Sequence, residues 1–171
     1  VVWQCKRSVE ICESLKQHGL GEQINHKTGL LIDPYFSGTK LMWLAQHQET
    51  VQQALANGEA YFGTIDTWLL YKMTGGRSYV TDYTNASRTL LFNLHTLNWD
   101  QELIDLFGLK GINLPEIKPS SALFGETILE GLFDPAIPVT GMIGDSHAAA
   151  FGEGCFETGT AKATLGTGCS I

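Results

Sequence analysis

The stretch Ile137–Gly152 reads IPVTGMIGDSHAAAFG and decides the fold class. Its first part, Ile137–Ile143, is an apolar run of strand length, which Gly144 and Asp145 end. The residues that follow, Ser146–Gly152, are mostly small and are compatible with a helix. A strand followed directly by a helix is the repeating unit of α/β proteins, so the stretch predicts an α/β fold.

Strands and helices are predicted to alternate through the rest of the chain. Apolar residues at helical spacing predict helices over Cys5–His18, from Ser37 onward, over Val51–Asn57, over Ile65–Met73 and after the capping residue Asp100. Strand-like segments are predicted at Val1–Gln4, within Tyr79–Thr96, at Lys162–Leu165 and at Cys169–Ile171. Gly19 and Gly58 are expected to end two of the helices, and Thr50 is the candidate cap of the second of these. The short polar stretch before Leu30 is interpreted as a connection.

The composition is that of a folded, acidic protein. Lys and Arg number 11 against 18 Asp and Glu, which gives a formal net charge of −7, and 43% of the residues are hydrophobic. A nucleic-acid binder needs a basic surface for the phosphates, so we expect no nucleic-acid partner. No apolar run approaches the roughly 20 residues that cross a bilayer, so we expect no membrane insertion.

The cysteines and the ends of the chain give two further expectations. Cys5, Cys12, Cys155 and Cys169 are scattered and lack the density of a secreted disulfide scaffold, which favours a reducing cytoplasm. The chain opens on Val1 without an initiator Met, and both of its ends are strand-like. We therefore expect a piece of a longer protein.

Asp145 is predicted at the carboxyl end of a strand, which is where ligands bind in open α/β sheets. A carboxylate at this point can act as a general base or as a metal ligand. It can also be the N-cap of the helix over Ser146–Gly152, because Asp is among the best capping residues. From position alone the two interpretations have comparable weight.

The tripeptide Gly166-Thr167-Gly168 lies between two strand-like segments that follow Asp145. Most such tripeptides are hairpin turns. Glycines also let backbone N–H groups approach a phosphate closely, and Thr167 adds a hydroxyl donor, so a phosphate cradle is the functional alternative. A base together with a phosphate cradle is what phosphoryl transfer requires. The Walker motif and G-x-G-x-x-G do not occur, and the five histidines lack the spacing of a zinc site.

Trp3 and Tyr35 are by default core or boundary aromatics. The alternative is that they line an apolar wall, where the hydroxyl of Tyr35 faces a polar ligand.

Six runs of the sequence, in order along the whole chain, resemble the glycerol kinase branch of the FGGY carbohydrate kinase family. They are Val2–Gln4 (VWQ), Asp33–Lys40 (DPYFSGTK), Gly63–Leu69 (GTIDTWL), Thr81–Thr89 (TDYTNASRT), Gly144-Asp145 and Gly166–Cys169 (GTGC). Several of these runs are far longer, and so far more specific, than a short motif.

The resemblance implies a ribonuclease H-like fold of the actin and hexokinase type, with ATP and sugar bound between two domains. We expect residues 1–158 to be the distal part of the N-terminal, substrate-binding domain. Residues 159–171 are expected to be the first hairpin of the C-terminal, nucleotide-binding domain. The family's first phosphate loop, with its Mg-binding Asp, is expected before Val1.

The resemblance also implies roles for individual residues. It makes Asp145 the general base that takes the proton from the attacking polyol hydroxyl, and it places Trp3 and Tyr35 against the polyol. It places Gly166, Thr167 and Gly168 at the phosphates of ATP. Ser146 and Ser170 are implied to face the substrate where the family usually has Gln and an aromatic residue, which leaves room for a polyol larger than glycerol.

The function expected from the resemblance is ATP- and Mg²⁺-dependent phosphorylation of a polyol, with glycerol converted to glycerol 3-phosphate by the full-length protein. The segment alone is expected to be inactive. The first alternative is a kinase of the same family for another polyol or a pentulose, and the second is a binding module that has lost catalysis. We expect a small polyol or sugar as the substrate, a cytoplasmic location and a homo-oligomer.

Overall fold

The computed structural model describes residues 1–165 and 169–170, in which four helices come first and strands and helices are mixed along the rest of the chain. The helices are α1 (Val9–Gln17), α2 (Gly21–Thr28), α3 (Ser37–His47), α4 (Glu49–Asn57), α5 (Ile65–Met73), α6 (Tyr83–Ala86), α7 (Gln101–Leu106) and α8 (Asp145–Gly152). The strands are β1 (Ala60–Tyr61), β2 (Val80–Asp82), β3 (Phe92–Asn93), β4 (Asn98–Trp99), β5 (Ile112–Asn113), β6 (Glu116–Lys118), β7 (Ser121–Thr127), β8 (Ile137–Gly141), β9 (Thr164–Leu165) and β10 (Cys169–Ser170). The predicted α/β fold is confirmed.

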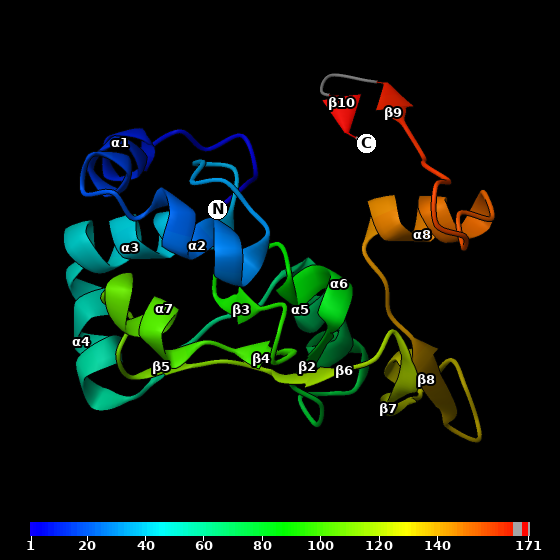
Figure 1. The fold of residues 1–171 in the computed structure, drawn as a ribbon. Helices are drawn as coiled ribbons and strands as arrows, with labels where there is room; N and C mark the ends of the chain where they lie inside the picture. Colours follow the sequence, from blue (N-terminus) through cyan, green and yellow to red (C-terminus); the bar gives the residue numbers. More distant parts are fainter. Residues whose placement is uncertain (166–168, 171) are drawn as a thin grey trace.

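The strands pair two by two. β1 pairs with β5 and β2 with β6 in parallel, whereas β3 with β4, β7 with β8 and β9 with β10 are antiparallel. A parallel pair needs a crossover connection, and α6 and α7 lie in the connection from β2 to β6. Figure 1 shows β5, β4, β2 and β6 along one side of the body, with α1, α2 and α3 on the opposite side.

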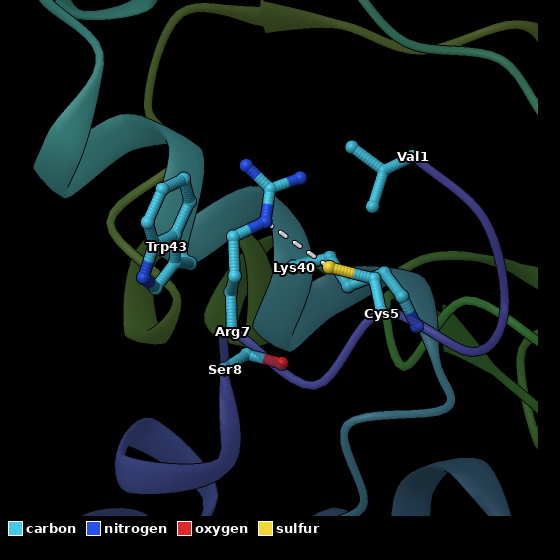
Figure 2. A pocket seen from close by; sticks show the side chains of 6 residues that line it. All are labelled: Val1, Cys5, Arg7, Ser8, Lys40 and Trp43. Atoms are coloured by element: carbon cyan, nitrogen blue, oxygen red, sulfur yellow. Dashed lines mark hydrogen bonds between the residues drawn. The ribbon is translucent and has the colours of Figure 1, made fainter.

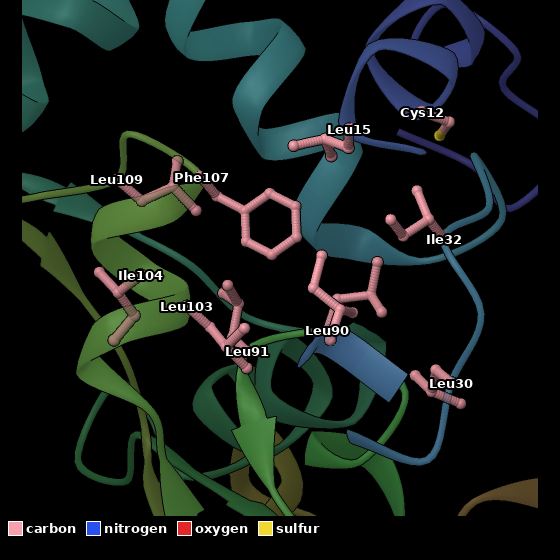
Figure 3. Close-up of a cluster of buried hydrophobic side chains, with 11 residues drawn as sticks. Cys12, Leu15, Leu30, Ile32, Leu90, Leu91, Leu103, Ile104, Phe107 and Leu109 are labelled. Carbon is pink, nitrogen blue, oxygen red and sulfur yellow. The ribbon is translucent and has the colours of Figure 1, made fainter. Parts of the chain in front are cut away.

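The main hydrophobic core lies between α1, α2, α7 and the segment that joins α6 to β3 (Figure 3). Its buried residues are Cys12, Leu15, Ile24, Leu30, Ile32, Leu90, Leu91, Leu103, Ile104, Phe107 and Leu109. α3 approaches this core through Gly38, whose N–H donates to the carbonyl of Thr89 at 2.7 Å. A Cβ on Gly38 would lie 3.0 Å from that carbonyl oxygen, so the close approach depends on glycine.

The C-terminal part of the chain is packed much less closely. In Figure 1, α8 and the β9–β10 pair extend away from the body. The structure describes every residue of α8, and none of them is buried. Phe151 and Phe156 are both exposed and contact each other edge to face, with ring centroids 5.2 Å apart.

The prediction of a strand at Val1–Gln4 is wrong. The N–H of Cys5 donates to the carbonyl of Val2 at 3.1 Å, which closes a turn. A strand forms only where a neighbouring backbone takes up its hydrogen bonds, and no strand in the described part of the chain pairs with these residues.

The polar stretch before Leu30 contains a helix, α2, that the sequence analysis did not predict. Ile24 and Thr28 lie four residues apart on its buried side, and the hydroxyl of Thr28 donates to the carbonyl of Ile24 at 2.7 Å. Gly29 ends the helix in the left-handed conformation, with φ 70°. Packing against the core therefore stabilises a helix that is too polar to recognise by periodicity.

Other helix boundaries agree with the predictions to within a few residues. Gly19 and Gly58 end α1 and α4 with φ 72° and 70°, as predicted. The helix predicted from Cys5 begins only at Val9. The N-cap of α4 is Gln48, so the prediction of Thr50 as the cap is wrong.

The four apolar residues that predict α5 do not face the core. Ile65, Trp68, Leu69 and Met73 are all exposed, and the buried residues of this helix are Thr67 and Leu70. The helix is predicted correctly, but the apolar residues whose spacing predicts it lie on the surface of the described structure.

Candidate functional site

Asp145 is the first residue of α8, directly after the turn that follows β8. The N-cap of α8 is Gly144, with extended backbone and no side-chain cap, so the interpretation of Asp145 as the N-cap is wrong. The side chain is exposed, and its Oδ1 accepts the N–H of Ser146 at 2.6 Å. A negative charge is favoured at a helix N-terminus, because the backbone N–H groups there carry partial positive charge. The structure thus presents an exposed carboxylate at the end of a strand.

Trp3 and Tyr35 come from different segments and lie side by side. Their ring centroids are 5.9 Å apart with an interplanar angle of 58°. Of the default expectation that they are core or boundary residues, the core is excluded, because their side chains are 55% and 49% exposed. Phe36 supports Tyr35 from one side, with an edge-to-face contact at 5.2 Å. The two rings form an open apolar surface beside one phenolic hydroxyl.

Lys40 on α3 connects the two segments that carry these rings. It is only 8% exposed, and its ammonium donates to the carbonyls of Tyr35 at 2.6 Å, of Trp3 at 3.5 Å and of Pro34. Burial lowers the pKa of Lys40, since a charged form is costly away from water. The sequence analysis assigned no role to Lys40, and only its place in the run Asp33–Lys40 drew attention to it.

A small pocket lies next to Lys40 (Figure 2), and it is lined by Val1, Cys5, Arg7, Ser8, Lys40 and Trp43. The Nε of Arg7 donates to the Sγ of Cys5 at 3.1 Å, which lowers the pKa of that thiol. The guanidinium of Arg7 also stacks on Trp43, 4.4 Å from the ring centroid. Within this pocket Arg7 and Cys5 are thus paired with each other, whereas Ser8 and Lys40 bond to groups outside it.

Asp82, at the end of β2, is a buried carboxylate without a cationic partner among its hydrogen-bond donors. It is 0% exposed and caps α6, accepting the N–H groups of Thr84 at 3.1 Å and Asn85 at 3.0 Å. It also accepts the hydroxyls of Thr84 and Ser120, both at 2.6 Å, and the side-chain amide of Asn85 at 2.8 Å. Burial by itself raises the pKa of Asp82, but these hydrogen bonds outweigh it and hold the pKa below the ordinary value.

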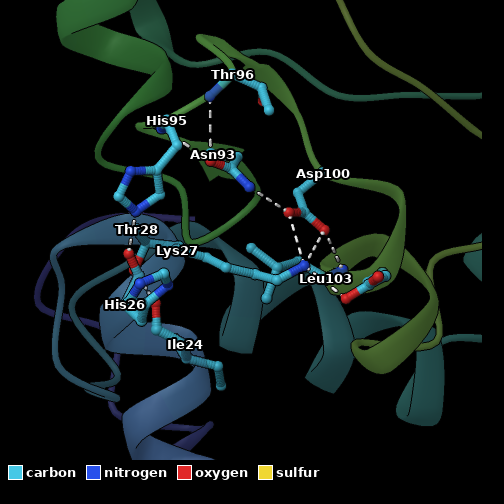
Figure 4. Close-up of polar contacts among 10 residues, drawn as sticks. Ile24, His26, Lys27, Thr28, Asn93, His95, Thr96, Asp100 and Leu103 are labelled. Atoms are coloured by element: carbon cyan, nitrogen blue, oxygen red, sulfur yellow. Dashed lines mark hydrogen bonds and ion pairs between the residues drawn. The ribbon is translucent and has the colours of Figure 1, made fainter.

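Asp100 plays a similar capping role at α7, with a cation beside it (Figure 4). The ammonium of Lys27 donates to both oxygens of Asp100, at 3.0 and 2.9 Å, and to Glu102 at 2.6 Å. Asn93 donates to Asp100 at 2.7 Å, and the N–H of Leu103 does so at 3.1 Å. These contacts join α2 to α7, and they leave the carboxylate fully engaged.

The structure describes only some of the remaining residues of the predicted site. Ser146 is the second residue of α8 and is exposed. Ser170 lies in β10 with its backbone opposite Thr164, and Gly166, Thr167 and Gly168 lie outside the described residues. Among the described residues, no hydrogen bond or aromatic contact joins Asp145 or Ser146 to the Trp3–Tyr35 pair.

The described residues contain neither a metal-binding cluster nor a membrane-spanning helix. No group of three or more His, Cys, Asp or Glu side chains is close enough to hold a metal ion. In the same part of the chain, no helix is long and apolar enough to cross a membrane.

Comparison with known proteins gives consistent matches over almost the whole chain. The family described as "FGGY family of carbohydrate kinases, N-terminal domain" matches residues 1–152. The chain is 53% identical to the glycerol kinase of Bacillus licheniformis over 169 residues, which are 99% of this chain and 34% of that protein. It is 50% identical to the glycerol kinase of Halothermothrix orenii over 168 residues, with 98% and 34% covered.

Solved structures match in the same way. A crystal structure of Plasmodium falciparum glycerol kinase with ADP superposes with a TM-score of 0.90 at 38% identity, covering 99% of this chain and 34% of that one. The gluconate kinase of Lactobacillus acidophilus superposes with a TM-score of 0.75 at 28% identity, covering 86% and 30%. The chain thus spans about a third of the length of the curated relatives it matches.

Proposed function

Since the chain belongs to the FGGY family of carbohydrate kinases, we propose that it forms the distal part of the substrate-binding domain of an ATP-dependent kinase for a small polyol. Glycerol is the substrate that we propose first, with glycerol 3-phosphate as the product, because the relatives that share about half of its residues are glycerol kinases. We assign residues 1–158 to the substrate-binding domain and residues 159–171 to the first hairpin of a nucleotide-binding domain. The antiparallel pairing of β9 with β10 supports the hairpin.

The observation that carries the proposal is the exposed carboxylate of Asp145 at the start of α8. As a polyol hydroxyl attacks the γ-phosphorus of ATP, an O–P bond forms and the bond to the leaving ADP oxygen breaks. The hydroxyl proton passes to a carboxylate oxygen of Asp145. A positioned general base of this kind contributes about 10²- to 10⁴-fold to the rate.

The Trp3–Tyr35 pair is the proposed wall of the polyol site. The carbon chain of a polyol packs against the exposed ring faces, and the hydroxyl of Tyr35 pairs with a substrate hydroxyl. Lys40 supports this wall from behind by holding the backbone of both residues.

The nucleotide part of the site rests on Gly166, Thr167 and Gly168, which we propose as the turn that contacts the phosphates. We also propose that Mg²⁺ binds with the nucleotide, where it would neutralise phosphate charge, and we assign no protein ligand to it.

A cytoplasmic location is supported by Cys5, Cys12 and Cys155, which are free thiols. Assembly as a homo-oligomer is proposed from the family resemblance.

A second candidate is a kinase for a longer polyol or a pentulose. Ser146 favours it, because an exposed, short side chain directly after Asp145 leaves more room than the Gln usual in the family. A non-catalytic binding module is the third candidate. The exposed Asp145 argues against it, since a module without chemistry has no need of a free carboxylate at this point.

The test uses the full-length kinase with Asp145→Asn and, as a matched control, Asp105→Asn, which changes an exposed helical carboxylate outside the site. The amide keeps the shape of Asp145 but cannot accept the proton, so kcat should fall by about 10²-fold or more with the KM for ATP unchanged. Asp105→Asn should behave as wild type. Activity of Asp145→Asn within tenfold of wild type would remove Asp145 from the role of base.

A phosphorylation screen over glycerol, erythritol and pentuloses separates the three candidates. The highest kcat/KM on glycerol supports the first candidate, and a preference for longer substrates supports the second. No phosphorylation of any of them would favour the binding module.

A further inference from the structure

The turn that precedes Asp145 makes a hydrogen bond to a residue far away in the sequence. The N–H of Gly144 donates to the hydroxyl oxygen of Thr84 at 2.7 Å, although the two residues are 60 positions apart. A Cβ on Gly144 would lie 3.5 Å from that oxygen and 3.3 Å from Nδ1 of His147, so the turn packs closely at this point. Figure 1 shows the chain between β8 and α8 passing beside α6, which carries Thr84.

The hydroxyl of Thr84 is held in a fixed orientation. It has one proton, which it donates to Asp82 at 2.6 Å. Its oxygen is thereby left to accept, and it accepts from Gly144. Hydrogen bonds to an ionised carboxylate are shorter and stronger than neutral ones, so the buried charge of Asp82 stiffens this contact.

A second contact leads from the same turn back to the same carboxylate. The N–H of Met142 donates to the carbonyl of Ser120 at 3.0 Å, and the hydroxyl of Ser120 donates to Asp82 at 2.6 Å. Asp82 therefore holds the turn from both sides, through Thr84 and through Ser120. Because no residue of α8 is buried, the position of Asp145 depends on the turn before it, which this polar connection holds together with the packing of Met142 against the core.

We propose that Thr84 and Asp82 are positioning residues, which set the place and direction of the Asp145 carboxylate through the turn at Gly144. The proposal rests on the proposed function, in which Asp145 is the base. A reacting group that is misplaced by about 1 Å can cost on the order of 10²-fold in rate, so the loss of such a contact is visible in kcat.

The first test compares Thr84→Val, which keeps the shape but removes the hydroxyl, with Thr84→Ser, which keeps the hydroxyl. In the full-length kinase, kcat should fall roughly ten- to a hundredfold in Thr84→Val with little change in the KM for ATP, and Thr84→Ser should stay within about threefold of wild type. Thr89→Val is the matched control, because it removes a buried hydroxyl bonded to Ala86 and not to Asp82. It should lower the melting temperature but leave kcat unchanged.

A double variant tests whether Thr84 acts through Asp145. If it does, Asp145→Asn with Thr84→Val should be no more than about twofold slower than Asp145→Asn alone, because the positioned group is already lost. A further loss as large as that in the wild-type background would overturn the proposal, and so would an unchanged kcat in Thr84→Val.

A readout independent of activity separates this proposal from the proposed function. Hydrogen exchange of the full-length kinase, followed in a peptide that contains Gly144, should be roughly five- to twentyfold faster in Thr84→Val than in Thr84→Ser. Equal exchange in the two variants would contradict the connection, whatever the activity. If Asp145→Asn stays active while exchange differs as expected, the proposed function fails and only the connection between Thr84 and Gly144 remains.

Discussion

Asp100 and Asp145, like Asp82, each lie between a strand and a helix, but their two regions of the molecule use the aspartate differently. At the junction of β4 and α7, Asp100 is buried, caps the helix and binds Lys27. At the junction of β8 and α8, Asp145 is exposed, and Gly144 takes the capping position. The first helix packs Leu103 and Ile104 into the core, whereas the second has no buried residue. A carboxylate with all its partners inside the protein serves stability, and one that is left exposed can serve a substrate.

The largest difference between the regions should appear when apolar side chains are removed. Leu103→Ala should destabilise the chain by about 3 kcal/mol, since it removes a fully buried side chain and leaves a cavity. Phe151→Ala on α8 should cost less than about 1 kcal/mol, because it loses an exposed side chain and one aromatic contact. Urea unfolding of the two variants measures both values. If the two variants lost equal stability, α8 would have to be as closely packed as α7, and the difference drawn between the two regions would be wrong.

The two aspartates themselves should differ by a smaller amount. Asp100→Ala removes a helix cap and the partner of Lys27, which should cost about 2 kcal/mol. Asp145→Ala should change the free energy of unfolding by no more than about 0.5 kcal/mol. Urea unfolding measures the loss of stability in both variants, with Asp105→Ala as the exposed control. A stability loss in Asp145→Ala as large as that in Asp100→Ala would give Asp145 a structural role.

The smallest effect is expected in the dependence of stability on pH. Burial raises the pKa of Asp100, but hydrogen bonds from Asn93, Lys27 and Leu103 outweigh it and hold the pKa below the ordinary value. A carboxyl with a lowered pKa stabilises the fold above its unfolded pKa of about 4, and this contribution is lost as the pH falls through the folded pKa.

Asp100→Asn should therefore lose less stability than wild type when the pH is lowered from about 5 to about 3, and the two should change in parallel near neutral pH. Unfolding curves at several pH values measure this. Identical acid sensitivity of wild type and variant would show that Asp100 does not contribute to it.

Much of the fold could be predicted from local patterns. The strand, turn and helix of Ile137–Gly152 and the helix ends at Gly19 and Gly58 depend on residues close in sequence. The predictions that failed concern features that depend on residues far apart in the sequence. The strand predicted at Val1–Gln4 needed a neighbouring strand, and α2 depends on the core into which Ile24 packs. Neither requirement is visible in a window of sequence.

The candidate site shows the same division. The place of Asp145 at the end of a strand follows from its neighbours, but the pattern of strand, aspartate and helix is shared with Asp100 and does not tell a cap from a free carboxylate. The run Thr81–Thr89 stands out for the family resemblance, and the capping of α6 by Asp82 is not predicted from it. The contact of Thr84 with Gly144 joins residues 60 positions apart and could be found only in the structure.

The way in which Lys40 holds the Trp3–Tyr35 pair bears on how this protein can change over evolution. Its ammonium binds main-chain carbonyl oxygens, which every amino acid possesses, and it makes no demand on the side chains at positions 3 and 35. Lys40 can therefore hold the backbone at positions 3 and 35 whichever side chains these positions carry. At the wall that we propose for the polyol site, substitutions at these two positions can alter which molecules bind while the main chain keeps its place, so selectivity can diversify without the scaffold being rebuilt.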